Sequence, residues 1–279
     1  MKIGVSAFAW TAEFGASHLH LLPKVREHGL EGFEIPMFDP GTPPVSAIRR
    51  AFESADLECT VCATLPAGIN PISPDASVRA KSLAHLFRCI ETSAEFGAHL
   101  IGGPLFAPIG YLPGRRRTID EWNWAIECFQ ELGEILDANE VTLSIEPVNR
   151  SETFFLMTAA DARSLCDAIS HPRVGVTIDT FHANIEEKNI ANAMRSLGHC
   201  LRHVHASEND RGLLGSGHVD FPSIVTALQE IAYDGYLMIE GFGYAPEEVN
   251  SFGAVWGDLR VSPEDIAFGG GNYLRTLLQ

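Results

Sequence analysis

Short apolar runs alternate with longer amphipathic segments along the whole chain, and this pattern gives the first indication of the fold. The short runs are rich in β-branched residues and have the length of buried strands. Eight strands are predicted, at Ile3–Ala9, Gly32–Ile35, Cys59–Thr64, His99–Gly102, Thr142–Glu146, Val174–Asp179, Leu201–His205 and Tyr236–Glu240. Between them, apolar residues recur every three to four positions, which predicts helices, for example over Ser77–Phe96 and Ile119–Asn139.

Alternation of strands and helices is typical of a parallel sheet with right-handed crossovers. Eight strand–helix units in 279 residues favour a single closed (β/α)8 TIM barrel, an α/β fold, over an open doubly wound sheet. Gly29 and Gly97 follow helical segments at points where a left-handed residue would end the helix, and Pro74–Ser77 resembles a turn that leads into one. The Gly-rich and Phe-rich segment Gly241–Gly271 is expected to form a loop over the barrel mouth. Residues 1–279 are therefore expected to form one catalytic domain.

The charge of the chain narrows the range of partners. A formal net charge of −16 repels phosphate backbones and anionic lipids, so we expect no nucleic-acid and no membrane partner. The first residues lead directly into a strand without the features of a signal peptide, which predicts a cytoplasmic protein. Its six cysteines are then expected to be reduced. Cys59 and Cys62 lack the second Cys-x-x-Cys pair of a zinc ribbon, so we interpret them as strand residues of the core.

Acidic residues and a histidine stand where the last four predicted strands end. These residues are Glu146, Asp179, His205 and Glu240. In barrels of this kind the carboxyl ends of the strands carry the catalytic groups. Three carboxylates that converge without a cation repel one another, and a divalent ion removes that conflict. Any one of the four could merely cap its strand, but the succession predicts a metal centre. Oxygen-rich ligation with one imidazole favours Mn²⁺, with Mg²⁺, Co²⁺ and Zn²⁺ as alternatives.

A resemblance to a known family extends beyond these four positions. It is carried by five segments: Ile145–Arg150, Asp179–Asn184, His205–Gly212, Gly215–Phe221 and Val255–Leu259. Together they resemble the xylose isomerase-like TIM barrels, and specifically the D-tagatose/D-psicose (allulose) 3-epimerase group of ketose 3-epimerases. The resemblance implies a free ketose as substrate and a homodimer or homotetramer.

The resemblance also implies substrate contacts. Glu152, His182 and Arg211 stand six, three and six residues after successive metal-ligand candidates, at the spacing of the family's substrate-binding residues. They would hold the O1/O2 end of the ketose. Each also has a purely structural interpretation. Glu152 could be a solvated loop acid, His182 a helix cap and Arg211 a surface ion-pair partner. Phe242 corresponds to an aromatic wall of the family's pocket, and Trp10, after strand one, is a further candidate for an apolar surface.

Epimerisation at C3 requires one group to remove a proton and another to deliver one to the opposite face. Glu146 and Glu240 are the candidates, because strands five and eight would bring them to opposite sides of the metal. The metal would stabilise the enediolate formed between the two steps. Other histidines are expected to be structural. Among them, His203 is expected to face away from the barrel interior.

Several alternatives remain at this point. An aldose–ketose isomerase of the hydroxypyruvate type, or a dehydratase acting on a cyclitol, would use similar groups. A non-catalytic sugar-binding barrel is the alternative from another class. A nuclease resembling endonuclease IV requires additional histidines on early strands and a basic surface. Here those strands end in Glu34–Pro36 and Ala63–Leu65, and the chain is acidic.

Overall fold

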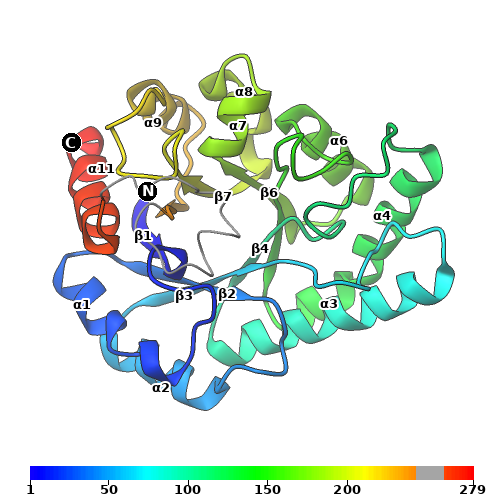
Figure 1. The fold of residues 1–279 in the computed structure, drawn as a ribbon, viewed down its shortest axis with the longest axis horizontal. Helices are drawn as coiled ribbons and strands as arrows, with labels where there is room; N and C mark the ends of the chain where they lie inside the picture. Colours follow the sequence, from blue (N-terminus) through cyan, green and yellow to red (C-terminus); the bar gives the residue numbers. More distant parts are fainter. Residues whose placement is uncertain (243–260) are drawn as a thin grey trace.

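The fold is a closed barrel of parallel strands inside a ring of helices (Figure 1). The structure, a computed structural model, describes residues 1–242 and 261–279. Each strand pairs with its neighbours in sequence, and β8 pairs with β1. The strands are β1 Lys2–Ser6, β2 Gly32–Met37, β3 Glu58–Ala63, β4 Leu100–Gly103, β5 Thr142–Ile145, β6 Val174–Asp179, β7 Leu201–Ala206 and β8 Tyr236–Ile239. The predicted fold class and all eight predicted strands are confirmed.

Helices follow the strands and cover the outside of the barrel. The α-helices are α1 Leu21–Glu27, α2 Val45–Ala55, α3 Ala76–Phe96, α4 Ile119–Glu131, α5 Gly133–Ala138, α6 Ala159–Ile169, α7 Thr180–Glu186, α8 Ile190–Leu197, α9 Phe221–Glu230 and α11 Gly270–Leu278. Short turns of other helix types are η1 Ala7–Ala9, η2 Ala16–His18, η3 Gly198–Cys200 and the π-helical η4 Asp265–Gly269. Helix α11 contacts both α9 and β1, so the end of the chain closes the ring next to its beginning.

The local signals act as the sequence predicts. Asp75 begins α3 by accepting a hydrogen bond from the Ser77 backbone N–H at 2.8 Å. Gly97 ends the same helix with φ +85°, and Gly29 has φ +73° after α1. A left-handed residue at a helix end is accessible to glycine without steric cost. Thus the boundaries of α3 follow from three residues.

Three predicted boundaries are wrong. Strand β1 ends at Ser6, because the chain turns there into η1 and the Phe8 N–H donates to the Ser6 hydroxyl at 3.4 Å. The single helix predicted over Ile119–Asn139 is two helices, interrupted beside Gly133, where a Cβ would lie 3.0 Å from the His171 ring. The predicted loop Gly241–Gly271 includes helical residues from η4 onward. Its residues 243–260 lie outside the described part of the chain.

The barrel interior beneath its rim is polar, whereas such interiors are commonly filled by branched aliphatic residues. Buried side chains in this layer are Ser6, Glu34, Thr60, Ser144, Thr177 and His203. They are hydrogen-bonded in part to one another: the Thr177 hydroxyl donates to the Ser144 hydroxyl at 2.7 Å, and the Thr60 hydroxyl donates to Glu34 at 3.1 Å. The layer therefore forms a polar floor under the rim.

His203 belongs to this floor, so the prediction that it faces away from the interior is wrong. Its Nε2 lies 3.0 Å from Glu34 Oε2, and the side chain is 1% exposed. The physical reason is the period of a strand: residues two apart, such as His203 and His205, point to the same face.

The six cysteines are buried and unpaired, and Cys59 and Cys62 lie on β3, as predicted. Among the described helices, none has the length and apolar character needed to cross a membrane.

Candidate active site and metal centre

Four side chains from consecutive strands meet at the carboxyl-end rim of the barrel. Asp179 is the last residue of β6 and His205 lies on β7, while Glu146 and Glu240 directly follow β5 and β8. The backbone amides of the two glutamates donate to Gly103 and Ala206 carbonyls at 3.0 and 3.1 Å, which continues the strand pairing and fixes both backbones. All four side chains are at least 95% buried.

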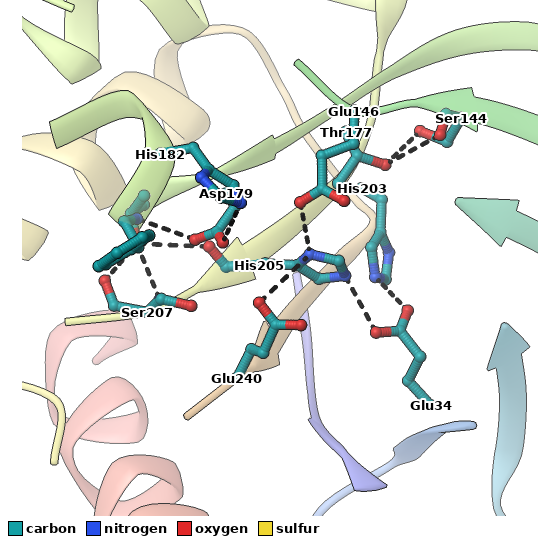
Figure 2. A network of polar contacts seen from close by, with 12 residues as sticks. Glu34, Ser144, Glu146, Thr177, Asp179, His182, His203, His205, Ser207 and Glu240 are labelled. Carbon is teal, nitrogen blue, oxygen red and sulfur yellow. Dashed lines mark hydrogen bonds and ion pairs between the residues drawn. The ribbon is translucent and has the colours of Figure 1, made fainter. Parts of the chain in front are cut away.

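Two of the carboxylates approach the same nitrogen of His205 (Figure 2). Nδ1 of His205 lies 3.0 Å from Glu146 Oε1 and 3.8 Å from Glu240 Oε2. One donor atom each from Glu146, Asp179 and His205 lies within 4.8 Å of the others. Buried carboxylates beside one imidazole are a donor set suited to a divalent cation. The site therefore fits a divalent metal, with Glu146, Asp179 and His205 at its centre and Glu240 beside them.

Arg211, from the loop after β7, ties two of these carboxylates together. Its Nη1 donates to Asp179 Oδ2 at 2.6 Å and to Glu240 Oε2 at 2.7 Å. The guanidinium carbon lies 4.0 Å from the Phe181 ring centre and 5.0 Å from that of Phe242. Nε of Arg211 is buried and has no hydrogen-bond partner in the described part of the chain. The two rings hold the guanidinium in place.

The environment drives the two carboxylates beside Arg211 toward opposite protonation states. Burial alone would raise the pKa of Asp179, but the charge of Arg211, together with His182, His205 and the Phe181 backbone N–H, outweighs it and lowers the pKa of Asp179 to about 2. Burial raises the pKa of Glu240 to about 8, with Asp179 and Glu146 acting in the same direction and His205 and Arg211 against it. Carboxyl pairs whose pKa values are driven apart are typical of acid–base sites.

His182 and Glu152 are held by one amide, that of Asn149. The Asn149 backbone N–H and side-chain Nδ2 lie 3.3 and 2.9 Å from His182 Nδ1, and Nδ2 also donates to Glu152 Oε1 at 2.8 Å. Since the backbone N–H can only donate, Nδ1 accepts and the imidazole proton lies on Nε2. Burial lowers the pKa of His182 to about 3, which keeps the ring neutral. The protonated Nε2 lies 3.6 Å from Asp179 Oδ2 and 3.3 Å from Arg211 Nη2.

Asn149 is a positioning group that the sequence reasoning missed. The Ser151 backbone N–H donates to Asn149 Oδ1 at 2.9 Å, which fixes the orientation of the amide and aims Nδ2 at the other two side chains. Burial also raises the pKa of Glu152. A signal was present in the sequence: an asparagine three residues before the predicted substrate-binding glutamate.

Glu34 is the second missed residue. It is fully buried on β2, and its Oε1 lies 3.0 Å from Nε2 of His205, the ring nitrogen opposite to the one that faces Glu146 (Figure 2). Burial opposes ionisation, but the charges of His205 and His203 outweigh it and hold the pKa of Glu34 far below its usual range. The available signal was an acid inside an otherwise apolar predicted strand.

A pocket opens beside these groups at the barrel rim. Its lining residues are Phe8, Cys62, Thr64, Pro104, Ile109, Glu146, Val148, Glu152, His182, Arg211, Glu240 and Phe242. The rings of Phe8 and Phe242 lie 5.3 Å apart and form an apolar wall.

The pocket brings together most, but not all, of the predicted site residues. Glu152, His182, Arg211 and Phe242 line it together with Glu146 and Glu240. Trp10 is not among the described lining residues: it packs against Phe33 and Phe268, and its indole N–H donates to Glu264 at 3.4 Å. Phe8, two residues earlier, supplies the aromatic surface at this end of β1. The segment Val255–Leu259, part of the predicted resemblance, lies outside the described residues.

Comparison with known proteins agrees with this geometry. Residues 22–257 match the sequence model of the xylose isomerase-like TIM barrel. The chain belongs to this family. Among curated relatives, a protein named "Probable ketose 3-epimerase" from Synechocystis sp. is 31% identical over 282 residues, which cover 100% of this chain and 97% of the relative.

Solved structures of xylose isomerase-like barrels superpose closely on the chain. A D-allulose 3-epimerase from Methylomonas sp. has a TM-score of 0.93 and 25% identity and covers 99% of this chain and 98% of its own. A D-psicose 3-epimerase from Clostridium cellulolyticum H10, solved with D-tagatose, has a TM-score of 0.91 and 26% identity over 100% of both chains. Within the xylose isomerase-like barrels, the chain therefore groups with the ketose 3-epimerases.

Proposed function

We propose that this protein interconverts free ketoses at C3, with Glu146 and Glu240 as the two proton-transfer groups. The observation that carries the proposal is the approach of both carboxylates to Nδ1 of the same histidine, His205, from strands at opposite ends of the site. A C3 proton beside a ketone is weakly acidic, so one carboxylate can remove it while the other returns a proton to the opposite face. In the reverse reaction the two exchange roles.

The remaining pocket groups orient the sugar. His182 and Arg211 are hydrogen-bond donors toward the ketose O1 and O2 oxygens, and Glu152 accepts from a hydroxyl at the same end. Phe242 and Phe8 cover the apolar face of the sugar. The relatives' names support ketoses as the substrate class, and D-tagatose accompanies one of the solved neighbours.

Glu146, Asp179, His205 and Glu240 would hold the divalent metal. Its chemistry, once bound, is Lewis-acid stabilisation of the negative charge that develops on the sugar oxygens during enediolate formation. We propose Mn²⁺ as the ion, since oxygen donors and one imidazole suit it, and Co²⁺ and Mg²⁺ as substitutes. Arg211 holds Asp179 and Glu240 side by side and so maintains the spacing of the donor set.

The test is NMR of the Mn²⁺-reconstituted and then diluted enzyme with D-fructose, D-tagatose and L-ribulose in D₂O. We expect C3 epimers that carry deuterium at C3. Glu146→Gln and Glu240→Gln are each expected to abolish epimerisation. If each glutamate acts on one face of C3, the glutamate that remains in each variant can still exchange a C3 proton with solvent. Each variant should then exchange the C3 proton of one of the two epimers and not of the other.

Two outcomes would contradict the proposal. Deuterium at C1 with an aldose product would assign the site to an aldose–ketose isomerase, which uses the same acids on neighbouring carbons. Absence of exchange from every ketose, with metal bound, would leave a sugar-binding barrel without this chemistry. Glu121→Gln, which removes a buried carboxylate bound by Arg115 at the start of α4, is the control for loss of a buried charge.

The wider expectations are part of the same proposal. Residues 1–279 act as one catalytic domain in the cytoplasm, and the chain assembles as a homodimer or homotetramer. Light scattering coupled to size-exclusion chromatography measures the assembly, and a monomeric mass at micromolar concentration would contradict it.

A further inference from the structure

His205 has a carboxylate on each side of its ring, and the two carboxylates cannot have the same function. Nδ1 lies 3.0 Å from Glu146 Oε1 and faces the metal-ligand candidates. Nε2 lies 3.0 Å from Glu34 Oε1 and faces the polar floor of the barrel. A neutral imidazole has one lone pair and one N–H, so a nitrogen that binds a metal requires the proton to be on the other nitrogen.

Glu34 is itself fixed by the floor of the barrel. Its second oxygen, Oε2, lies 3.0 Å from Nε2 of His203 and accepts the Thr60 hydroxyl at 3.1 Å. Strands β2 and β7 are not neighbours in the barrel, so the contacts of Glu34 with His203 and His205 cross its interior. The carboxylate thus reaches His205 from the far wall of the barrel.

These groups depend on one another. Glu34 and the two histidines are at most 1% exposed. Glu34 Oε1 and both Nε2 atoms have no hydrogen bond within the described part of the chain, so the 3.0 Å ion-pair contacts are their polar partners there. Removal of one partner leaves buried polar atoms unpaired, which is costly.

We propose that Glu34 is a positioning residue of the metal centre: it holds the proton of His205 on Nε2 and thereby directs the Nδ1 lone pair to the metal. His203 and Thr60 hold Glu34 in place. The inference rests on the proposed metal centre. Carboxylates that orient a metal-binding histidine in this way increase metal affinity by roughly 10- to 100-fold in other sites.

A rival explanation is available from the same residues. Donor atoms of Glu34, Cys62 and His205 lie within 4.8 Å of one another, so Glu34 could itself be the ligand of a second cation. The two explanations differ in the number of metal ions bound per chain. If Glu34 only positions His205, each chain binds one ion. If Glu34, Cys62 and His205 are ligands, each chain binds a second ion, of a metal that favours sulfur ligands. The ion-pair contacts of both Glu34 oxygens with histidines favour the positioning function.

The experiment measures metal binding rather than turnover. Free Mn²⁺ is followed by electron paramagnetic resonance during titration of chelator-treated wild type, Glu34→Gln and Glu121→Gln. We expect a Kd for Mn²⁺ that is 10- to 100-fold higher in Glu34→Gln and unchanged in Glu121→Gln. Thr60→Val, which removes only the hydroxyl that anchors Glu34, should raise the Kd by a smaller factor and serves if Glu34→Gln fails to fold.

A spectroscopic readout distinguishes positioning from general loss of structure. In Mg²⁺-loaded wild type, the His205 Nε2–H should give a protected downfield proton resonance, which should shift upfield in Thr60→Val and Glu34→Gln. Equal Mn²⁺ affinity in wild type, Glu34→Gln and Thr60→Val would overturn the inference alone. A second Co²⁺ per chain, with a thiolate absorption band that is lost in Cys62→Ser, would also overturn it. A wild type that binds no Mn²⁺ would overturn the metal centre together with the inference.

Discussion

Asn149 donates from one amide group to both Glu152 and His182, at 2.8 and 2.9 Å. The Asn149 side chain thus sets the distance between Glu152 and His182, two of the proposed sugar contacts, and it also sets the tautomer of His182. This arrangement makes Asn149 a more sensitive test of the pocket than either of the residues that it holds.

Replacement of Asn149 by Asp should reverse the polarity of this link. An aspartate oxygen would replace the Nδ2 donor, repel Glu152 and draw the proton of His182 to Nδ1. We expect ¹⁵N NMR of the His182 ring to report the tautomer change. We also expect kcat/KM to fall by about 10- to 100-fold, which corresponds to the free energy of one hydrogen bond to a charged group. Asn184→Asp is the matched control, because Asn184 makes a similar contact with His218, at 3.3 Å, on the exposed surface. An unchanged His182 tautomer would contradict the assignment.

Arg211→Lys preserves the charge but removes the planar fork that lies between Phe181 and Phe242. Lysine cannot reproduce the stacked geometry. We expect the KM for the ketose to rise by about 10- to 100-fold, since the planar guanidinium is lost as a donor group, while Mn²⁺ still binds. Arg150→Lys changes an exposed arginine that pairs with Glu186 and should leave the KM unchanged. Equal KM values in both variants would exclude Arg211 as a sugar contact.

Gly217→Ala should destabilise the loop that carries Arg211. A Cβ at this position would lie 2.1 Å from Asn209 Oδ1 and 2.5 Å from Glu208 Oε1. Glu208 cannot retreat easily, because it is buried and accepts backbone N–H groups of Gly215 and Val219 at 3.0 and 2.9 Å. We expect a loss of about 1–3 kcal/mol of unfolding free energy in urea. Gly15→Ala, where a Cβ meets nothing within 4 Å, is the control, and a similar small loss in both would contradict the prediction.

Burial of His182 should make the metal-free protein less stable in acid. Its pKa is about 3 in the folded chain and about 6.5 for a histidine in an unfolded chain, so the unfolded chain binds more protons between these values. The stabilisation is complete above pH 6.5 and is lost as the pH falls toward 3. Between pH 7.5 and 5.0, His182 alone should cost about 2 kcal/mol. Urea unfolding in EDTA should therefore show a weaker pH dependence in His182→Gln, and an identical dependence would refute this.

The rim residues were predictable because a parallel barrel brings the carboxyl ends of all its strands to one end. Glu146, Asp179, His205 and Glu240 could be identified from strand ends alone, without knowledge of packing. Their convergence in the structure depends on that topology, and the backbone pairing at Gly103 and Ala206 supports it.

The positioning residues were less accessible because their contacts are not local in sequence. Glu34 meets His205 across the barrel interior, and no periodicity in β2 indicates which strand lies opposite. For His203 the error was one of strand geometry. Phe8 lines the pocket in place of the predicted Trp10 for another reason. The turn at Ser6 decides which aromatic side chain faces the pocket, whereas the sequence predicts a strand that continues past Ser6.

The pocket is divided between the two halves of the chain. The charged groups that line it, from Glu146 to Glu240, all come from β5 to β8 and their loops, whereas the first four strands and their loops contribute uncharged residues such as Phe8, Cys62 and Ile109. Mutational change at these uncharged lining residues can therefore reshape the sugar's surroundings while the proton-transfer groups stay in place. A library confined to lining residues such as Phe8, Cys62 and Ile109, with Glu34 and Thr60 kept, would be a direct route to new ketose preferences.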